Sequence, residues 1–256
     1  MPVIENPQLP PGYRHIGLGD TQSTNLDCLD HLRRGDPGRL WITADRQLAG
    51  RGSRGRGWVS EPGNLYASLL LRDPAPFSRL HTLGFAASLA VRDTLIALGG
   101  GGLPPVTVKW PNDVLVGGAK ICGLLLESHE ADGARYAIVG IGINTAHRPG
   151  DTLYRATSLA EEGLSVSALM AFQHLAVALD TRLAQWSRGD GFAATRDDWL
   201  RAAHGLGGPI EVQMSAGSGG ERFSGRFVGL DEEGLLLLAE AGGRLRKVSA
   251  ADIFFA

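Results

Sequence analysis

The stretch Gly50-Arg-Gly-Ser-Arg-Gly-Arg-Gly-Trp58 decides between two fold classes for this chain. Gly50, Gly52 and Gly55 fit the G-x-G-x-x-G pattern of a dinucleotide-binding fold. That pattern should open a helix and be followed, about 20 residues later, by an acidic residue for the ribose. Here Val59-Ser-Glu-Pro-Gly63 follows, which predicts a turn, and residues 64–71 are apolar enough for a strand buried on both faces. A NAD-type dehydrogenase is therefore disfavoured.

The same stretch has a chemistry of its own, because it carries three arginines among its glycines. Guanidinium groups and backbone N–H donors in a flexible loop are suited to phosphate oxygens. We expect the loop to fold over a bound anion. A solvated surface loop is the alternative interpretation.

Outward from this loop the chain alternates helices and strands, which predicts a mixed α+β domain. Residues 14–34 predict a strand, a turn and a helix capped by Ser23 or Thr24, and residues 39–44 a further strand. Downstream we expect a helix over 81–98, strands over 106–110, 120–128 and 134–143, and helices over 165–186 and 192–204. After Gly205 only short β runs separated by glycine-rich turns remain. The predicted domains are residues 1–207 and a small β-barrel or sandwich over residues 208–256.

Composition narrows the functional classes. The formal net charge of −2 argues against a nucleic-acid binder that relies on a broad basic surface. The two cysteines, Cys28 and Cys122, lack metal-site spacing and are expected to be reduced packing residues. We see no leader-like N-terminus and no stretch approaching the ~18 to 20 apolar residues of a membrane span, so a cytoplasmic protein is the default expectation. Basic positions are nearly all arginine, and only Lys109, Lys120 and Lys247 are lysines.

Two of those lysines lie in motif-rich segments. Lys109-Trp-Pro-Asn-Asp113 places a cation, an aromatic ring, an amide and a carboxylate at a strand end, which suits a magnesium–nucleotide site. A capped turn is the alternative. Lys120-Ile-Cys-Gly-Leu-Leu-Leu-Glu127 places a lysine just before a buried strand, and Gly123 would let a ligand approach the backbone.

Two further segments offer hydrogen-bonding groups. Gly140-Ile-Gly-Ile-Asn144 has glycines at alternate positions, which leaves one strand face bare, and ends on an amide that can pair with adenine. Simple strand packing explains this segment equally well. Ser23-Thr-Asn25 could bind a compact polar ring such as a ureido group, although capping alone would explain the Ser or Thr.

The ordered occurrence of S-T-N, Q-x-A-G-R-G-x-x-G-R-x-W, K-W-P-N-D, K-I-x-G-x-L-x-E and G-x-G-I-N resembles the biotin–protein ligase family over roughly residues 14–205. The weak β tail is similar to that family's small SH3-like C-terminal domain. The resemblance implies the catalytic fold shared with class II aminoacyl-tRNA synthetases. It also implies formation of biotinyl-AMP from biotin and Mg–ATP, followed by transfer of biotin to a lysine of a biotin carboxyl carrier protein.

Site residues follow from the same resemblance. The catalytic residues would be Lys120, Asp113 and Arg51, with Asp113 also the candidate magnesium ligand. The implied biotin site comprises Ser23, Thr24, Asn25, Gln47, Arg51, Gly52, Ser53, Lys120 and Gly123. The implied ATP site comprises Arg54, Arg56, Trp58, Lys109, Asn112, Asp113 and Asn144.

Departures from the family pattern affect some of these expectations. Ser53 stands where many relatives have an arginine, which could weaken retention of the adenylate, and Leu48 replaces a small polar residue. Only about a dozen residues precede the first strand, so we expect neither the DNA-binding domain of some relatives nor DNA binding. Monomer and homodimer remain open, and edge strands such as residues 134–143 could pair with a carrier or a second subunit. Lipoate–protein ligase or octanoyl transferase is the nearest rival interpretation, and a non-catalytic biotin sensor is another.

Overall fold

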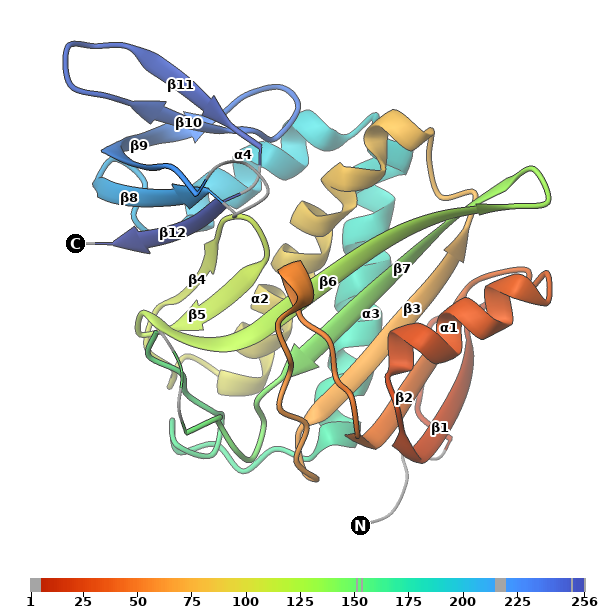
Figure 1. Ribbon diagram of the computed structural model, residues 1–256. Coiled ribbons are helices and arrows are strands. Elements are labelled where there is room, and N and C mark those ends of the chain that lie inside the picture. The colour runs from red at the N-terminus through yellow and green to blue at the C-terminus, as the bar shows by residue number, and fades with distance from the viewer. Residues whose placement is uncertain (1–5, 151, 153, 215–219, 250, 256) are drawn as a thin grey trace.

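The computed structural model describes residues 6–150, 152, 154–214, 220–249 and 251–255, with the side chain of Arg54 outside the description. Its larger unit is built on a seven-stranded sheet in the order β1-β2-β3-β7-β6-β5-β4 (Figure 1). Only the β1–β2 pair is parallel, and the other pairs are antiparallel. The strands are β1 Arg14–Thr21, β2 Leu40–Gln47, β3 Leu65–Arg72, β4 Val106–Lys109, β5 Asp113–Val116, β6 Ala119–Ala131 and β7 Ala134–Ile143.

Helices cover both faces of this sheet. Helix α1 (Thr24–Arg33) lies on one face, while α2 (Leu83–Gly99) and α3 (Ala168–Trp186) lie on the other, with α4 (Phe192–Ala202) beside them (Figure 1). Helix α2 is apolar around most of its circumference because it packs against the sheet, α3 and α4. It ends where the glycine run predicts, since Gly100 adopts a left-handed conformation with φ of 53°.

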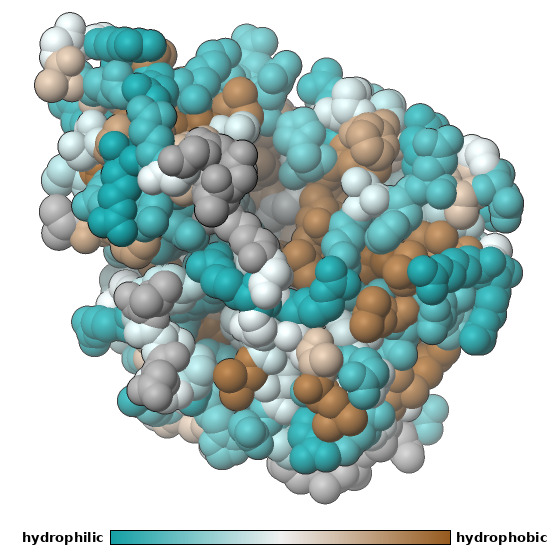
Figure 2. Space-filling view, viewed as in Figure 1, coloured by the Kyte–Doolittle hydropathy of each residue, from teal (hydrophilic) through white to brown (hydrophobic). Residues whose placement is uncertain are grey.

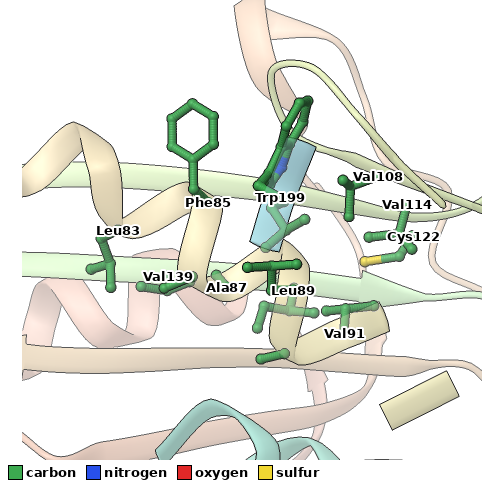
Figure 3. Close-up of a cluster of buried hydrophobic side chains, with 14 of the residues drawn as sticks. Leu83, Phe85, Ala87, Leu89, Val91, Val108, Val114, Cys122, Val139 and Trp199 are labelled. Carbon is green, nitrogen blue, oxygen red and sulfur yellow. The ribbon is translucent and has the colours of Figure 1, made fainter. Parts of the chain in front are cut away.

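The main core lies between α2 and the sheet. Leu83, Leu89 and Val91 of α2 point toward strand residues such as Val114 and Val139 (Figure 3). Trp199 of α4 closes this cluster from the side, and its indole N–H donates to Ser88 Oγ at 3.1 Å. The cysteines behave as the sequence predicts, because both are free and buried, Cys122 in this core and Cys28 in the smaller cluster under α1.

One length of chain satisfies the length and composition of a membrane span. Residues 77–99, which include α2, have a mean hydropathy of 1.3, although 61% of the window is buried inside the protein. The prediction that no stretch approaches the length and composition of a membrane span is therefore wrong. Most of the apolar side chains of α2 lie in the main core, although Phe77 and Ile96 of this window are exposed.

A second sheet of five strands has the order β11-β10-β9-β8-β12. Its strands are β8 Pro209–Met214, β9 Arg222–Leu230, β10 Leu236–Ala239, β11 Leu245–Val248 and β12 Ala251–Phe255. It packs beside β4 and α4, and Trp110 Nε1 donates to Gly234 O at 3.1 Å across the junction (Figure 1). Figure 2 shows hydrophilic residues over most of this unit, while hydrophobic residues gather where α1 lies.

The predicted α+β class and the order of its elements are confirmed. Strands β5 and β12 were not predicted, because each is only four or five residues long. The prediction of an edge strand over residues 134–143 is wrong: β7 is an interior strand hydrogen-bonded to β3 and β6. Its near-continuous apolar run is typical of such a position. The domain boundary after residue 207 stays a prediction.

Candidate active site

A pocket opens on the sheet face that carries α1, beneath the loop that joins β2 to β3. We call residues 50–57 of that connection the Arg/Gly loop; it passes in front of the sheet in Figure 1. The pocket is bounded by the start of α1, this loop and strands β5 to β7. Its lining comprises Ser23, Thr24, Asn25, Gln47, Arg51, Gly52, Ser53, Trp58, Asn112, Asp113, Lys120, Gly123, Leu124, Leu125, Gly140, Ile141 and Gly142.

Strand register explains why this face of the sheet is open. Asp113 of β5, Gly123 of β6 and Gly142 of β7 are successive partners in one row across the sheet. Because side chains alternate along a strand, Val139 and Ile141 enter the core while the glycines face the pocket. A methyl group added at Gly140 would lie 2.3 Å from Asn25 Oδ1, so the bare face is needed for the side chains that lie on it.

The start of α1 supplies the polar end of the pocket. Ser23 has the extended backbone of an N-cap residue, but its side chain makes no capping hydrogen bond. Its hydroxyl therefore belongs to the pocket, which it lines, rather than to the helix. Gln47 Oε1 accepts from the Thr24 backbone N–H at 3.0 Å, and Gln47 Nε2 donates to Ser60 Oγ at 3.1 Å. Both ends of the Gln47 amide are thus fixed.

A buried polar chain continues from Thr24 across the sheet. Ser68 Oγ lies 2.7 Å from Thr24 Oγ1 and 2.6 Å from Asn25 Oδ1. The Asn25 amide nitrogen donates to Glu127 Oε2 at 2.7 Å. Glu127 Oε1 lies 3.5 Å from a guanidinium nitrogen of Arg51 in the Arg/Gly loop. This series of polar contacts therefore joins α1, the sheet and the Arg/Gly loop.

The opposite wall carries the closest ion pair of the pocket. Lys120 Nζ lies 2.6 Å from Asp113 Oδ1, and both side chains are largely buried, with 15% and 14% exposure. Their strands β6 and β5 are neighbours, with a register irregularity between Val114 and Leu115. Two charges removed from water in this way are stabilised chiefly by each other. A ligand that enters here meets a preformed cation beside a carboxylate.

Trp58 divides the pocket from a second one. Its ring lies on the glycine row, since a methyl group at Gly142 would be 2.6 Å from Trp58 Nε1 and one at Gly123 would be 2.8 Å from Cζ3. Lys120 Nζ lies 5.5 Å from the centre of the ring. The indole N–H is buried and has no hydrogen-bond partner among the described residues.

The second pocket adjoins the first and shares its central residues. Gly52, Ser53, Trp58 and Lys120 line both. The second pocket adds Arg56, Gly57, Val59, Asn144, Pro149, Thr152, Tyr154 and Ala156. Lys120 thus lies where two compartments meet, one rich in neutral hydrogen-bonding groups and the other flanked by an arginine and aromatic rings.

The Arg/Gly loop is held on both sides. Within the loop, Gly52 N donates to Arg56 O at 2.8 Å, and Trp58 N, which follows the loop, donates to Gly50 O at 2.8 Å. The Arg56 guanidinium donates to Tyr154 Oη at 3.2 Å and to Ser53 Oγ at 3.2 Å. It also lies 3.2 Å from Asp252 Oδ1 on β12. The C-terminal sheet therefore contacts the loop directly.

Lys109, at the end of β4, lies near Arg56 of the loop. Its ammonium lies 5.2 Å from the centre of the Tyr154 ring and 5.5 Å from that of Phe255. Burial lowers the pKa of Lys109, opposed in part by the charge of Asp113. It lines a small cleft with Arg56 and Asp113 beside β12, but neither of the two pockets described above.

The structure brings most of the predicted site residues together. All nine predicted biotin-site residues line the first pocket, as do Trp58, Asn112 and Asp113 from the predicted ATP site. Arg56 and Asn144 line the second. The Arg54 side chain lies outside the described part of the chain. The roles of all these residues stay predictions.

The two predicted amides, Asn112 and Asn144, each make a hydrogen bond to the backbone. Asn112 Nδ2 donates to Leu124 O at 2.6 Å, and Asn144 Nδ2 donates to Thr157 O at 3.0 Å. Each therefore spends one N–H on the backbone of a neighbouring segment. Asn144 is also almost fully buried, so its main contact is with the chain that follows β7.

Several residues of the site were not predicted individually. Glu127 lies in the K-I-x-G-x-L-x-E motif, but no role was predicted for this residue. Ser68, Tyr154 and Asp252 lie in a buried strand, a connection and the β tail, where the sequence has no motif to mark them. Only the packing of distant segments assembles them.

Comparisons with known proteins agree with this geometry. The model of the Biotin/lipoate A/B protein ligase family matches residues 19–144, and that of the biotin protein ligase C terminal domain matches residues 206–256. A biotin--[acetyl-CoA-carboxylase] ligase of Paracoccus denitrificans is 38% identical over 245 residues, which cover 93% of this chain and 99% of the relative. A ligase of the same name from Mycobacterium tuberculosis is 31% identical, covering 94% of this chain and 89% of its own length.

Solved structures lead to the same family. The biotin protein ligase from Aquifex aeolicus in complex with biotin and ATP aligns with a TM-score of 0.79 and 26% identity, covering 95% of this chain and 99% of that one. Fold and pocket thus define the class of biotin and lipoate ligases. Within it, the chain belongs to the biotin–protein ligase family.

Proposed function

We propose that this protein activates biotin with ATP as biotinyl-AMP and transfers the biotinyl group to a lysine of a biotin carboxyl carrier protein. One observation carries the proposal: Lys120, beside Asp113, lines both adjoining pockets. A carboxylate in the first and an α-phosphate in the second would meet at this ammonium. The biotin and ATP bound to the Aquifex aeolicus relative support the identity of the two ligands.

In the first half-reaction, a biotin carboxylate oxygen attacks the α-phosphorus of ATP and pyrophosphate leaves. The biotin carboxylate and the phosphates of ATP are all negatively charged, so positioning and charge neutralisation supply most of the rate. Lys120 is suited to hold the carboxylate against the α-phosphate, while Arg51 of the loop lines the first pocket and Arg56 the second. Trp58 and the loop would exclude water from the mixed anhydride.

In the second half-reaction, the ε-amine of the acceptor lysine attacks the acyl carbon and AMP leaves. The amine must first lose a proton, and Asp113 is the carboxylate within the pocket that could orient or accept it. Because Asp113 already contacts Lys120, any proton it takes up also changes the charge balance at the reacting anhydride.

Magnesium would be bound at this site together with the nucleotide. Among the described residues no cluster of three or more His, Cys, Asp or Glu side chains could hold a metal ion by itself. Magnesium is commonly held by one or two carboxylates together with substrate phosphates, and Asp113 fits that arrangement. The ion would neutralise phosphate charge when bound.

The acceptor is expected to be the biotin carrier domain of a carboxylase, since two relatives are named for acetyl-CoA carboxylase. That the protein binds no DNA also stays a prediction, which a sequence-specific, salt-sensitive gel shift would contradict. Monomer and homodimer both fit the proposal. Cytoplasmic localisation remains an expectation.

The decisive measurement is ligand-dependent ATP–pyrophosphate exchange with biotin, lipoate and octanoate. Exchange with biotin alone, lost in Lys120→Ala, is the expected result. Exchange with lipoate or octanoate instead would keep the chemistry and move the substrate to the sister ligases of the same family. Biotin binding without exchange would favour a sensor.

A further inference from the structure

We propose that Tyr154 is a positioning residue for the nucleotide: its side chain holds three cations at the proposed nucleotide site without neutralising their charge. The cations are Arg56, Lys109 and Lys120. The inference rests on the proposed function and deepens it, because it assigns a role to a residue that no motif of the sequence marks.

Tyr154 lies on the connection that follows β7, and the backbone next to it is paired with that of Lys120. Lys120 N donates to Arg155 O at 2.8 Å, and Thr157 N donates to Lys120 O at 2.9 Å. These bonds fix the position of Tyr154 relative to the lysine. The Tyr154 side chain lines both the second pocket and the small cleft beside β12.

Tyr154 contacts the three cations through two parts of its side chain, the hydroxyl group and the ring. The Arg56 guanidinium donates to the hydroxyl oxygen at 3.2 Å. The ammonium nitrogens of Lys109 and Lys120 lie 5.2 and 5.3 Å from the centre of the ring. Both distances fall within the ~6 Å over which an aromatic ring attracts a cation. The cations belong to the Arg/Gly loop, β4 and β6, so Tyr154 joins three separate elements.

The uncharged side chain of Tyr154 is suited to a site that must receive phosphates. Like charges that are gathered in one place repel one another and need a partner. A carboxylate in this position would neutralise the cations and compete with a phosphate for the same N–H groups. A phenol oxygen and an aromatic ring attract the cations and leave their charge available to the ligand.

Lys109 depends most on this ring. Among the described residues no carboxylate forms an ion pair with its ammonium, which lies beside the rings of Tyr154 and Phe255. Lys120 and Arg56 each also contact a carboxylate. Loss of the Tyr154 ring should therefore affect Lys109 more than the other two cations.

Two substitutions separate the hydroxyl group from the ring. Tyr154→Phe removes the contact with Arg56 and keeps the ring beside the two lysines, whereas Tyr154→Leu removes both. Tyr13 offers matched controls outside the two pockets. Its hydroxyl donates to Asp180 at 2.9 Å, and its ring centre lies 5.2 Å from the Arg39 guanidinium.

The experiment measures biotin-dependent ATP–pyrophosphate exchange with each substrate varied in turn. We expect Tyr154→Phe to raise the KM for ATP about threefold, since one hydrogen bond to a partly exposed guanidinium is lost. Tyr154→Leu should raise it about tenfold, since the attraction of the ring for two ammonium groups is lost as well. The KM for biotin should change less than about twofold, because Tyr154 does not line the first pocket. Tyr13→Phe and Tyr13→Leu should leave both constants unchanged.

Double variants test whether Tyr154 acts through the cations. In an Arg56→Ala background, Tyr154→Phe should not change the KM for ATP further, since the hydroxyl has already lost its partner. In a Lys109→Met background, Tyr154→Leu should exceed Tyr154→Phe by less than about twofold, since one of the two ammonium groups is already absent. General support of the fold would produce neither form of non-additivity.

The outcomes are separable. Absence of biotin-dependent exchange by the wild-type protein would overturn the proposed function and this inference with it. When the wild-type protein is active, an unchanged KM for ATP in Tyr154→Leu would overturn this inference alone. So would equal rises in the KM for ATP and for biotin, an equal effect of Tyr13→Leu, or additive effects of Tyr154→Phe and Arg56→Ala. If Tyr154→Leu does not fold, the conservative Tyr154→Phe and its pairing with Arg56→Ala decide the question.

Discussion

The Arg56 guanidinium of the Arg/Gly loop lies 3.2 Å from the Asp252 carboxylate on β12, so the last strand of the chain contacts the loop that covers the two pockets. The same guanidinium donates to Tyr154 Oη. The C-terminal sheet is thus part of the wall around the proposed nucleotide site. The contact between Arg56 and Asp252 couples its conformation to that of the loop.

Asp252→Asn should raise the KM for ATP in the exchange reaction by about two- to fivefold, with little change in the KM for biotin. The two side chains are 37% and 35% exposed, and partly exposed ion pairs contribute less than about 1 kcal/mol. Steady-state exchange kinetics with each substrate varied in turn would measure the change in the KM for ATP and in the KM for biotin separately. Glu211→Gln, which removes an exposed contact with Arg222 in the same sheet, should leave both constants unchanged. Equal effects on ATP and biotin would contradict the assignment of Arg56 to the nucleotide side.

Lys120→Ala should reduce biotin-dependent exchange by about a hundredfold or more, because the ammonium lies where carboxylate and phosphate are proposed to meet. It should also lower the free energy of unfolding by about 3 kcal/mol, since Asp113 is left buried without its partner. Exchange rates and denaturant titration test the two effects separately. Lys247→Ala is the matched control, because that lysine is exposed and paired with Asp231 outside the pockets. An exchange rate near the wild-type value for Lys120→Ala would exclude the central role of this lysine.

Gly142→Ala should displace Trp58 from the sheet and reduce exchange at least tenfold. The added methyl group would lie 2.6 Å from the indole nitrogen, a distance that requires the ring to move. Tryptophan fluorescence should shift to longer wavelength as the ring enters water, and the shift should be absent in a Trp58→Phe background. Gly19→Ala on β1 is the control, because a methyl group there meets nothing within 4 Å. An unchanged spectrum and rate would mean that the backbone at position 142 shifts to accommodate the methyl group while Trp58 stays in place.

Acid should destabilise the protein in part through His15. Burial lowers the pKa of His15 from 6.5 to about 4, while its ring packs 5.1 Å from Phe172. Between these values the unfolded chain binds a proton that the folded chain does not, so stability rises with pH across this window and is lost as the pH falls from 6.5 to 4. The contribution is about 3 kcal/mol at most. His15→Gln should flatten the dependence of the unfolding free energy on pH in this range, and an unchanged slope would refute the assignment.

Local sequence determined much of this protein. Strand and helix periodicity placed the principal elements, and the glycine run after Leu98 marked the end of α2. The resemblance of the ordered motifs identified the family, and twelve predicted residues line one pocket. Short-range patterns suffice here because backbone propensity, capping and alternation act over a few residues.

Long-range pairing could not be obtained in this way. The apolar run of residues 134–143 is typical of an interior strand, but it does not say which strands lie on each side. The partners of Glu127, Tyr154 and Asp252 come from distant segments, and no local motif encodes such a meeting. Sequence therefore determined which chemical groups are present, while tertiary packing decided which of them touch, and in a buried site those contacts set charge balance and hydrogen-bond direction.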